Sequence, residues 1–363
     1  MAFVDNRFEE RRRTVATELA ERRIDKLLIT HLVNLRYLTG FSGSNGALLL
    51  GAERSVALAT DGRYQTQIAQ EVPDIEARIT RPVAPALLAD VDGPQRVGIE
   101  ADHLSVAEFE ALQKACDEQV TLVPVRGLVE KQRRIKDAGE IEQLAEVAEL
   151  AAAALRGMLA DGAVRVGRTE REIAAELEYR MRTAGSERTS FDTIVASGLN
   201  SAKPHHGAED RELVAGDLVT IDFGAHARGY NSDMTRTYAV GEPDDFSREI
   251  YEVVQRAQQA GVEAAIVGTP LVDVDAACRD VIEAAGYGEY FVHSTGHGVG
   301  MDVHEEPAAS RNGEGELEDG MTVTIEPGIY VPGRGGVRIE DTVVVTEKGP
   351  RVITDLGRDL LVV

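Results

Sequence analysis

The sequence predicts an α/β domain followed by a second domain that combines helices with antiparallel β-sheet. Helix-like and strand-like segments alternate up to about residue 130, which is typical of α/β layers. Residues 128–160 are almost wholly helix-forming, and two later stretches alternate apolar and polar residues around a Gly-rich middle, as antiparallel hairpins do. The length of 363 residues also agrees with about two domains.

The first part of the chain contains one helical segment and several short strands. Residues 7–23 have helical periodicity with many i,i+4 charge pairs. Apolar runs bounded by Gly, Asn and Asp predict strands at 26–31, 47–50 and 56–59. Residues 39–46 (TGFSGSNG) are dense in Gly, Ser and Asn, which predicts a turn.

The composition changes at the long helical segment 128–160, in which apolar residues recur at helical spacing. We therefore place the domain boundary near Pro124–Gly127. The expected domains are 1–130 and 131–363.

The second domain contains an internal similarity. Residues 166–185 and 267–286 both open with Val-Gly, close with Ala-Gly and carry the same apolar helical stripe. Thr169 and Asp273 are suitable residues for the start of each helix, and each segment ends on a Gly. A repeat of this kind predicts two helix-plus-sheet halves about a pseudo-twofold axis, with a site at their interface.

Composition argues against several classes of protein. Lys plus Arg number 39 and Asp plus Glu number 62, so the formal net charge is −23, and nucleic acid or an anionic membrane is an unsuitable partner. Cys116 and Cys278 are far apart, which argues against a disulfide framework or a thiolate zinc site and fits a reducing compartment. The first 23 residues lack the apolar core of a signal peptide, and no apolar run is long enough to span a membrane. We expect a cytoplasmic protein.

The first hairpin-like stretch, residues 218–240, carries two aspartates. A turn centred between Ala227 and Arg228 would place Asp222 directly opposite Asp233. Like charges at such positions destabilise a sheet, so this pair requires an explanation.

The second hairpin-like stretch, residues 321–345, repeats the pattern. A turn centred on Gly333 would place Glu326 opposite Glu340. A cation bound between the acids is the simplest explanation for both pairs. Side chains two residues apart share a face. We therefore expect these acids and neighbouring threonines to lie on polar sheet faces that border a space filled with water. These threonines are Thr220, Thr235, Thr324 and Thr342.

Histidines gather in a third segment, residues 292–306 (VHSTGHGVGMDVHEE). It contains His293, His297 and His304, and glycines flank the middle one; glycine allows backbone to approach closely. Another pair, His205 and His206, follows Pro204 in a predicted loop.

Four carboxylates with one or two imidazoles suit two divalent ions, of which Mn²⁺, Co²⁺, Fe²⁺ and Zn²⁺ fit this mixture of ligands. Two ions about 3.5–4 Å apart can hold a bridging hydroxide and polarise a carbonyl, which is hydrolytic chemistry. The remaining histidines could move protons or stabilise an oxyanion.

These motifs, in this order, resemble a known family. IDFGAHARGYNSDMTRT, HSTGHGVGMDVHEEP, TIEPGIY and GGVRIEDT, within residues 137–363, resemble the "pita-bread" metallopeptidases. NLRYLTGFSGSNG and TDGRY, within residues 1–130, resemble the N-terminal domain of the aminopeptidase P, prolidase and creatinase branch. The resemblance implies an α/β N-terminal domain and an α+β pita-bread catalytic domain with a curved antiparallel sheet. It also implies a homodimer or a larger homo-oligomer.

The resemblance implies five metal ligands. Asp222 would chelate one ion, and Asp233 and Glu340 would bridge both ions. His297 and Glu326 would complete the shell of the other ion. Glu326 would also take the proton from the bridging water as it attacks.

The resemblance also implies roles for residues around the metals. His205 and His304 would assist the tetrahedral intermediate and the leaving nitrogen. His293 would line the substrate pocket, Arg338 would orient acidic groups, and Tyr330 would face substrate. No role is assigned to His206 or His226.

The branch resemblance implies short peptides with proline in the second position, whose scissile bond is a tertiary amide without an N–H. Ser294 in HSTGHG favours an Xaa-Pro aminopeptidase by resemblance. An Xaa-Pro dipeptidase (prolidase) is the alternative, and no single residue decides between them. The expected cofactor is a pair of Mn²⁺ ions, with Co²⁺, Zn²⁺ or Fe²⁺ as alternatives.

Two other functions are less well supported. A methionine aminopeptidase shares the five ligands but usually lacks the N-terminal domain. Non-catalytic pita-bread proteins have lost ligands, whereas all five are present here.

Overall fold

The computed structural model describes residues 6–363. It forms two compact units, the first ending at Arg133 and the second spanning Arg134–Val363. Residues 1–5, part of the segment used to argue against a signal peptide, lie outside the described residues.

The first unit is built on one six-stranded sheet with the order β4-β3-β2-β1-β5-β6. The central strand β1 pairs antiparallel with β2 and parallel with β5, as in mixed α/β sheets. The strands are β1 (Lys26–Ile29), β2 (Gly46–Gly51), β3 (Val56–Thr60), β4 (Ala77–Ile79), β5 (Arg96–Glu100) and β6 (Thr121–Val125). The helices are α1 (Arg7–Glu21), α2 (Leu32–Thr39), α3 (Gln65–Glu71), α4 (Val83–Leu88), α5 (Val106–Ala115) and α6 (Leu128–Arg133).

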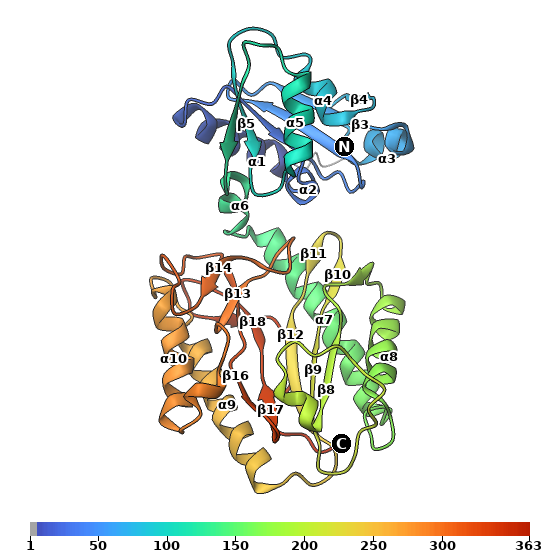
Figure 1. The fold of residues 1–363 in the computed structure, drawn as a ribbon, viewed down its shortest axis with the longest axis vertical. Helices are drawn as coiled ribbons and strands as arrows, with labels where there is room; N and C mark the ends of the chain where they lie inside the picture. Colours follow the sequence, from blue (N-terminus) through green and yellow to red (C-terminus); the bar gives the residue numbers. More distant parts are fainter. Residues whose placement is uncertain (1–5) are drawn as a thin grey trace. The chain divides into compact units, whose positions relative to one another are not determined.

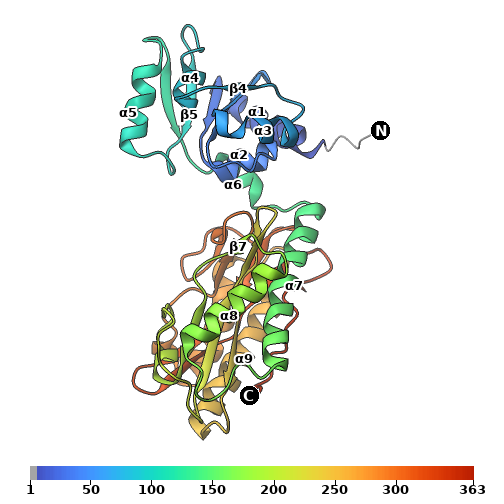
Figure 2. The same cartoon turned by 90° about the vertical axis from the view of Figure 1, so that its right-hand side faces the viewer.

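Helices cover both faces of this sheet, with α4 and α5 on one side and α1 and α2 on the other (Figure 2). Leu28, Leu49 and Val97 face the α4 and α5 layer, where they pack with Leu87 and Leu112. The alternate residues of β1 and β2 are buried as well, so the strands are apolar on both faces. The predicted helix at 7–23 and the three predicted strands are confirmed.

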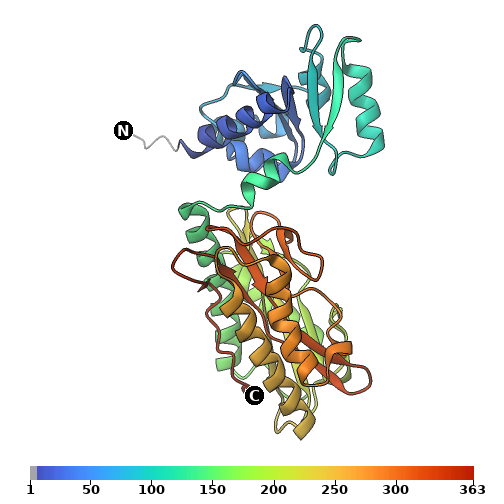
Figure 3. The same cartoon turned by 90° about the vertical axis from the view of Figure 1, so that its left-hand side faces the viewer.

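In the second unit, antiparallel strands lie between two pairs of helices (Figure 1). Helices α9 and α10 pack side by side over one face (Figure 3). The helices are α7 (Ala138–Ala160), α8 (Glu170–Thr183), α9 (Asp245–Ala264) and α10 (Leu271–Ala284). The strands are β7 (Arg188–Thr189), β8 (Ile194–Ser197), β9 (Leu218–Phe223), β10 (Ala225–Ala227), β11 (Tyr230–Asn231), β12 (Met234–Ala239), β13 (Gly296–Gly298), β14 (Glu305–Ala309), β15 (Thr322–Ile325), β16 (Gly328–Val331), β17 (Gly335–Arg338), β18 (Asp341–Val344) and β19 (Arg351–Val352).

The internal similarity corresponds to α8 and α10, whose first and last residues are 101 positions apart. Both helices are followed by a glycine with positive φ, Gly185 and Gly286, which is the common helix C-terminal signal. Thr169 caps α8 as predicted. The prediction for α10 is wrong, because Pro270 precedes the helix and Asp273 lies in its first turn.

The predicted continuous helix at 128–160 is also wrong. It is interrupted between α6 and α7, where Ile135 forms a β-bridge with Met321. Asp137 then starts α7 with a reciprocal capping box to Glu140. An aspartate three residues before a glutamate is a helix-start signal, and here it begins a new helix.

Among the residues that the structure describes, no helix combines the length and apolar character needed to cross a membrane.

Candidate active site

The first hairpin brings its two aspartates to the site in a register that differs from the predicted one. Asp222 pairs with Thr235, two residues beyond the predicted partner Asp233. The tight turn is Arg228–Gly229, where both residues have positive φ, as the preferred two-residue hairpin turn requires. Because the shift is two residues, each side chain remains on its predicted face.

The second hairpin confirms the predicted register centred on Gly333. Ile325 pairs with Asp341, and Gly328 pairs with Arg338, so Glu326 and Glu340 occupy opposed positions between the two ladders. Their backbone N–H groups donate elsewhere, to the carbonyls of Thr295 and Thr235. These bonds connect the second hairpin to the histidine segment and to the first hairpin.

His297 is positioned by a bulge in the β13–β14 ladder, where the register shifts between His297 and Gly298. The flanking glycines allow close backbone approach, because a Cβ at Gly296 would lie 1.7 Å from the Thr324 carbonyl oxygen. A Cβ at Gly298 would lie 2.2 Å from the Glu306 carbonyl oxygen. The predicted reason for glycine at these positions is therefore confirmed.

The five expected ligands converge, and the chemistry of their atoms fits a cation. The Nδ1 of His297 lies 3.0 Å from the Gly298 carbonyl and donates to it, so Nε2 presents a lone pair when the ring is neutral. This Nε2 faces Glu326 Oε1 at 3.4 Å and Asp233 Oδ2 at 3.6 Å. These three atoms can only accept hydrogen bonds and cannot bond one another, so a metal ion shared between them would stabilise their arrangement.

Two further observations support a metal site. The donor atoms of Asp233, His297 and Glu340 lie within 4.8 Å of one another. Asp222 Oδ1 is buried and has no hydrogen-bond partner within the described part of the chain, although its Oδ2 bonds Arg338 at 2.6 Å. An unpartnered buried oxygen is costly unless an ion or another donor uses it.

Burial and mutual repulsion perturb the acids. Burial raises the pKa of Asp233 well above its ordinary value, and Glu340 and Asp222 add to the effect. Burial likewise raises the pKa of Glu340 well above its ordinary value, with added repulsion from Glu326. Burial lowers the pKa of His297, which favours the neutral, ligating ring.

These shifts predict how the metal-free protein responds to pH. A carboxyl whose pKa is raised on folding contributes stability below its unfolded pKa of about 4, and this contribution is lost as pH rises through the folded pKa. We therefore expect the melting temperature of chelator-treated protein to fall, between mildly acidic and neutral pH, more steeply for wild type than for Glu340→Gln. Calorimetry of both proteins across pH measures the difference. Equal slopes, or a steeper fall for the variant, would show that Glu340 carries no repulsion in the metal-free fold.

A chain of hydrogen bonds holds the residues beside the acids. Arg338 donates to Asp222 and, at 2.9 Å, to the hydroxyl oxygen of Tyr330. The Tyr330 hydroxyl then donates to His293 Nε2 at 2.8 Å, since His293 Nδ1 donates to the Ser294 carbonyl. Burial raises the pKa of Tyr330 to about 12, so this hydroxyl keeps its proton.

The acids lie on one wall of a cavity of about 800 Å³. His293, Arg338, His205 and His304 also line it. Tyr330 is buried, and its hydroxyl bonds both His293 and Arg338.

His304 lies against the ring of His297, with centroids 4.3 Å apart in an edge-on arrangement. Burial, with the nearby His297 and His205 rings, lowers the pKa of His304. A neutral imidazole on the cavity wall can exchange protons near neutral pH.

Two of the threonines near the acids donate hydrogen bonds to acid side chains, which sequence reasoning missed. Thr235 Oγ1 donates to Glu340 at 2.7 Å, and Thr324 Oγ1 donates to Glu326 at 3.1 Å. The expectation that these threonines face water is wrong, because all four are buried: Thr220, Thr235, Thr324 and Thr342. Their position two residues from an acid was the available signal.

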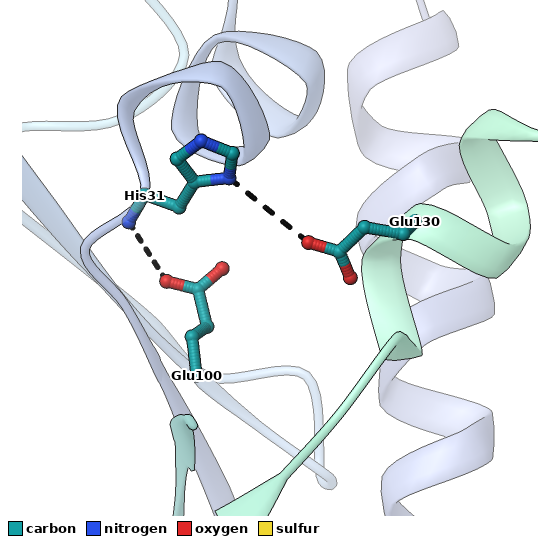
Figure 4. A group of neighbouring side chains, drawn as sticks. All are labelled: His31, Glu100 and Glu130. Carbon is teal, nitrogen blue, oxygen red and sulfur yellow. Dashed lines mark hydrogen bonds and ion pairs between the residues drawn. The ribbon is translucent and has the colours of Figure 1, made fainter. Parts of the chain in front are cut away.

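A second group of donors lies in the first unit, where His31, Glu100 and Glu130 come together (Figure 4). Glu100 accepts backbone N–H bonds from Thr30 and His31, and the Asn34 amide donates to both glutamates. These bonds place the Glu100 carboxylate on the N–H groups of Thr30 and His31, the two residues that lead into α2. Hydrogen bonding at a helix start is sufficient to explain this group.

Comparison with known proteins identifies the family. The family model for metallopeptidase family M24 matches residues 142–347. The chain belongs to this family. The model for the creatinase/prolidase N-terminal domain matches residues 11–135 of this M24 protein. The predicted family and fold class, including the pita-bread catalytic domain, are thereby confirmed.

Several relatives of this M24 chain match it over nearly their full length. An Xaa-Pro dipeptidase from Pyrococcus furiosus is 38% identical over 97% of this chain and 100% of its own. The solved structure of an Xaa-Pro dipeptidase from Bacillus anthracis is 41% identical, with a TM-score of 0.93 over 98% of this chain and 100% of its own. The structure of an X-Pro aminopeptidase from Thermotoga maritima is 37% identical, with a TM-score of 0.87 over 95% of this chain and 99% of its own.

Proposed function

We propose that the chain is an Xaa-Pro dipeptidase that hydrolyses the bond before proline with two divalent ions, Mn²⁺ first among them. The main observation that supports the proposal is that His297 Nε2 faces carboxylate oxygens of Asp233 and Glu326, at 3.6 and 3.4 Å. Asp222 and Glu340 complete the ligand set of the two ions. When bound, such ions supply a water of lowered pKa and polarise the scissile carbonyl.

The chain's own groups then move protons and orient the substrate. Glu326, whose pKa burial raises, is suited to take the proton from the attacking water. His304 and His205 line the cavity and would hydrogen-bond the tetrahedral oxyanion and protonate the leaving ring nitrogen. None of these steps requires an N–H on the scissile bond, so the tertiary amide of proline is accepted.

Dipeptides require recognition of the free carboxylate that follows proline. Arg338 lies on the cavity wall beside the acids, and a guanidinium is the preferred partner of a carboxylate. Its bonds to Thr235, Pro204, Tyr330 and Asp222 leave one Nη2–H for the substrate. The full-length similarity to the two Xaa-Pro dipeptidases favours this specificity over the aminopeptidase favoured by Ser294 in the sequence.

An Xaa-Pro aminopeptidase is the second candidate, because one observation favours it. The cavity volume of about 800 Å³ falls in the range of sites that hold drug-sized ligands, which leaves room for residues beyond proline. The similarity to the Thermotoga maritima X-Pro aminopeptidase agrees with this candidate.

Hydrolysis of Ala-Pro and Ala-Pro-Ala by chelator-stripped, Mn²⁺-reconstituted protein tests the proposal. We expect kcat/KM for Ala-Pro to exceed that for Ala-Pro-Ala by at least about tenfold, because a free proline carboxylate is the group recognised. Gly-Ala, which lacks proline, is the control substrate. Preferred cleavage of Ala-Pro-Ala after the first alanine would replace the dipeptidase by the aminopeptidase. Hydrolysis of neither proline peptide by protein with bound metal would contradict both.

A further inference from the structure

We propose that Glu170 and His206 form a buried positioning pair that holds the His205 loop against the active-site cavity. The inference rests on the proposed function, in which His205 acts on the reacting groups. His206 is itself among the residues that line the cavity, and the pair is given a role distinct from those of the five-ligand set and of His205 and His304.

Glu170 is the first residue of α8, and its side chain is fully buried. One carboxylate oxygen, Oε1, accepts from the backbone N–H and the hydroxyl of Ser197, at 2.8 and 2.7 Å, and from the Asn200 amide at 3.1 Å. The other oxygen, Oε2, accepts from His206 Nε2 at 2.7 Å and from the Glu209 backbone N–H at 3.1 Å. One carboxylate therefore connects α8, the end of β8 and both ends of the segment 206–209.

The His205 loop is held from two directions. His206 is buried, and its Nε2 lies toward α8. The preceding Pro204 carbonyl accepts from Arg338 Nη1 at 3.3 Å. His205 lies between these two attachment points and lines the cavity. Its position is therefore set by Glu170 on one side and by Arg338 on the other.

The chemistry of the pair fits a permanent structural link. Burial acts to raise the pKa of Glu170, but the hydrogen bonds from Ser197, His206 and Asn200 outweigh it and hold the pKa below its ordinary value. The carboxylate is an acceptor only, so His206 Nε2 carries the proton between them. Removing one partner of such a buried pair leaves the other unsatisfied, which is strongly destabilising locally.

The same group could be mistaken for a metal site, because donor atoms of Glu170, His206 and Glu209 lie within 4.8 Å of one another. The contact of 2.7 Å between His206 Nε2 and Glu170 Oε2 is hydrogen-bond distance, and Oε2 also accepts the Glu209 backbone N–H, so these atoms already have partners without an ion. Glu209 bonds Glu170 through its backbone N–H. The geometry is that of a hydrogen-bond network.

Sequence offered one signal for this network. Glu170 lies in the same helical stripe as the buried residues Ile173, Ala174 and Leu177, so an acid occupies a core position. A buried acid requires partners, and His206, which had no assigned role, is the one that reaches it from the active-site loop.

The test compares His206→Leu, which removes the bond to Glu170, with His206→Gln, whose amide nitrogen can still donate. Displacement of a reacting group by about 1 Å costs about 10²-fold in rate. We expect His206→Leu to lower kcat for Ala-Pro by about 10- to 100-fold, with KM within about threefold and metal content unchanged. We expect His206→Gln to restore most of kcat. Glu176→Gln is the matched control, because Glu176 lies on the same helix but bonds Arg168 and Arg180.

Hydrogen–deuterium exchange of the segment 197–209 gives a readout that does not depend on catalysis. We expect faster exchange there in His206→Leu and in Glu170→Gln than in wild type and Glu176→Gln, with the rest of the second unit unchanged. If wild type cleaved no proline peptide but this exchange pattern held, the proposed function would fail while the positioning pair survived.

Three results would overturn the positioning role. These are wild-type kcat in His206→Leu, unchanged exchange of the segment 197–209, and a fall in kcat that His206→Gln does not restore. If His206→Leu did not fold, Glu170→Gln and His206→Gln would be compared by the same two measurements.

Discussion

Asp233→Asn is expected to abolish Xaa-Pro hydrolysis and to lower the metal content of the purified protein. Asp233 is buried, and its Oδ2 lies opposite His297 Nε2. An amide of the same shape carries no charge, so the divalent ions lose a ligand whose charge balances theirs. We expect kcat/KM for Ala-Pro to fall by at least about 10³-fold. We also expect atomic absorption to show a lower metal content in the variant than in wild type.

Asp280→Asn is the matched control, since Asp280 is exposed on α10 and should leave activity and metal content unchanged. Metal-free Asp233→Asn should also melt at a higher temperature than metal-free wild type at neutral pH, because burial and the neighbouring acids destabilise the Asp233 carboxylate. Full activity and full metal content in Asp233→Asn would show that the hairpin does not supply a metal ligand.

His304→Ala is expected to reduce turnover by about 10²- to 10³-fold while the metal ions stay bound. General acid–base groups contribute in this range, and His304 lines the cavity with its ring edge-on to that of His297. The variant removes a proton-transfer group without removing a carboxylate or the His297 lone pair. Steady-state kinetics with Ala-Pro and metal analysis of the same preparation measure both consequences.

His103→Ala in the first unit is the control, because it removes an exposed histidine outside the cavity. Loss of metal from His304→Ala would instead make His304 a ligand and remove that role from His297. Unchanged turnover would show that His304 transfers no proton during the reaction.

Local sequence signals were sufficient for most secondary structure. The apolar runs at 26–31, 47–50 and 56–59 form β1, β2 and β3, because short β-rich runs bounded by turn residues have few alternatives. The interruption of the long helical segment was not predictable from such signals. Its residues favour helix on both sides of 134–137, and the β-bridge of Ile135 to Met321 is a tertiary contact that local propensity cannot report.

Register was predictable where the turn had one suitable centre. Gly333, with positive φ, fixed the second hairpin and placed Glu326 and Glu340 correctly. In the first hairpin the turn falls at Arg228–Gly229, so the predicted pairing of Asp222 was two residues out. The error left both aspartates on the predicted face, because side chains alternate with a period of two.

The sequence by itself predicted two kinds of domain from periodicity and spacing. The order of its motifs, through their resemblance to a known family, predicted the family, the five candidate metal ligands and the histidines of the site. Only the tertiary structure decided that Tyr330 bonds both His293 and Arg338, that Thr235 bonds Glu340, and that His206 bonds Glu170. Such contacts join residues between 8 and 105 positions apart, and burial and hydrogen-bond direction arise only when separate elements pack together.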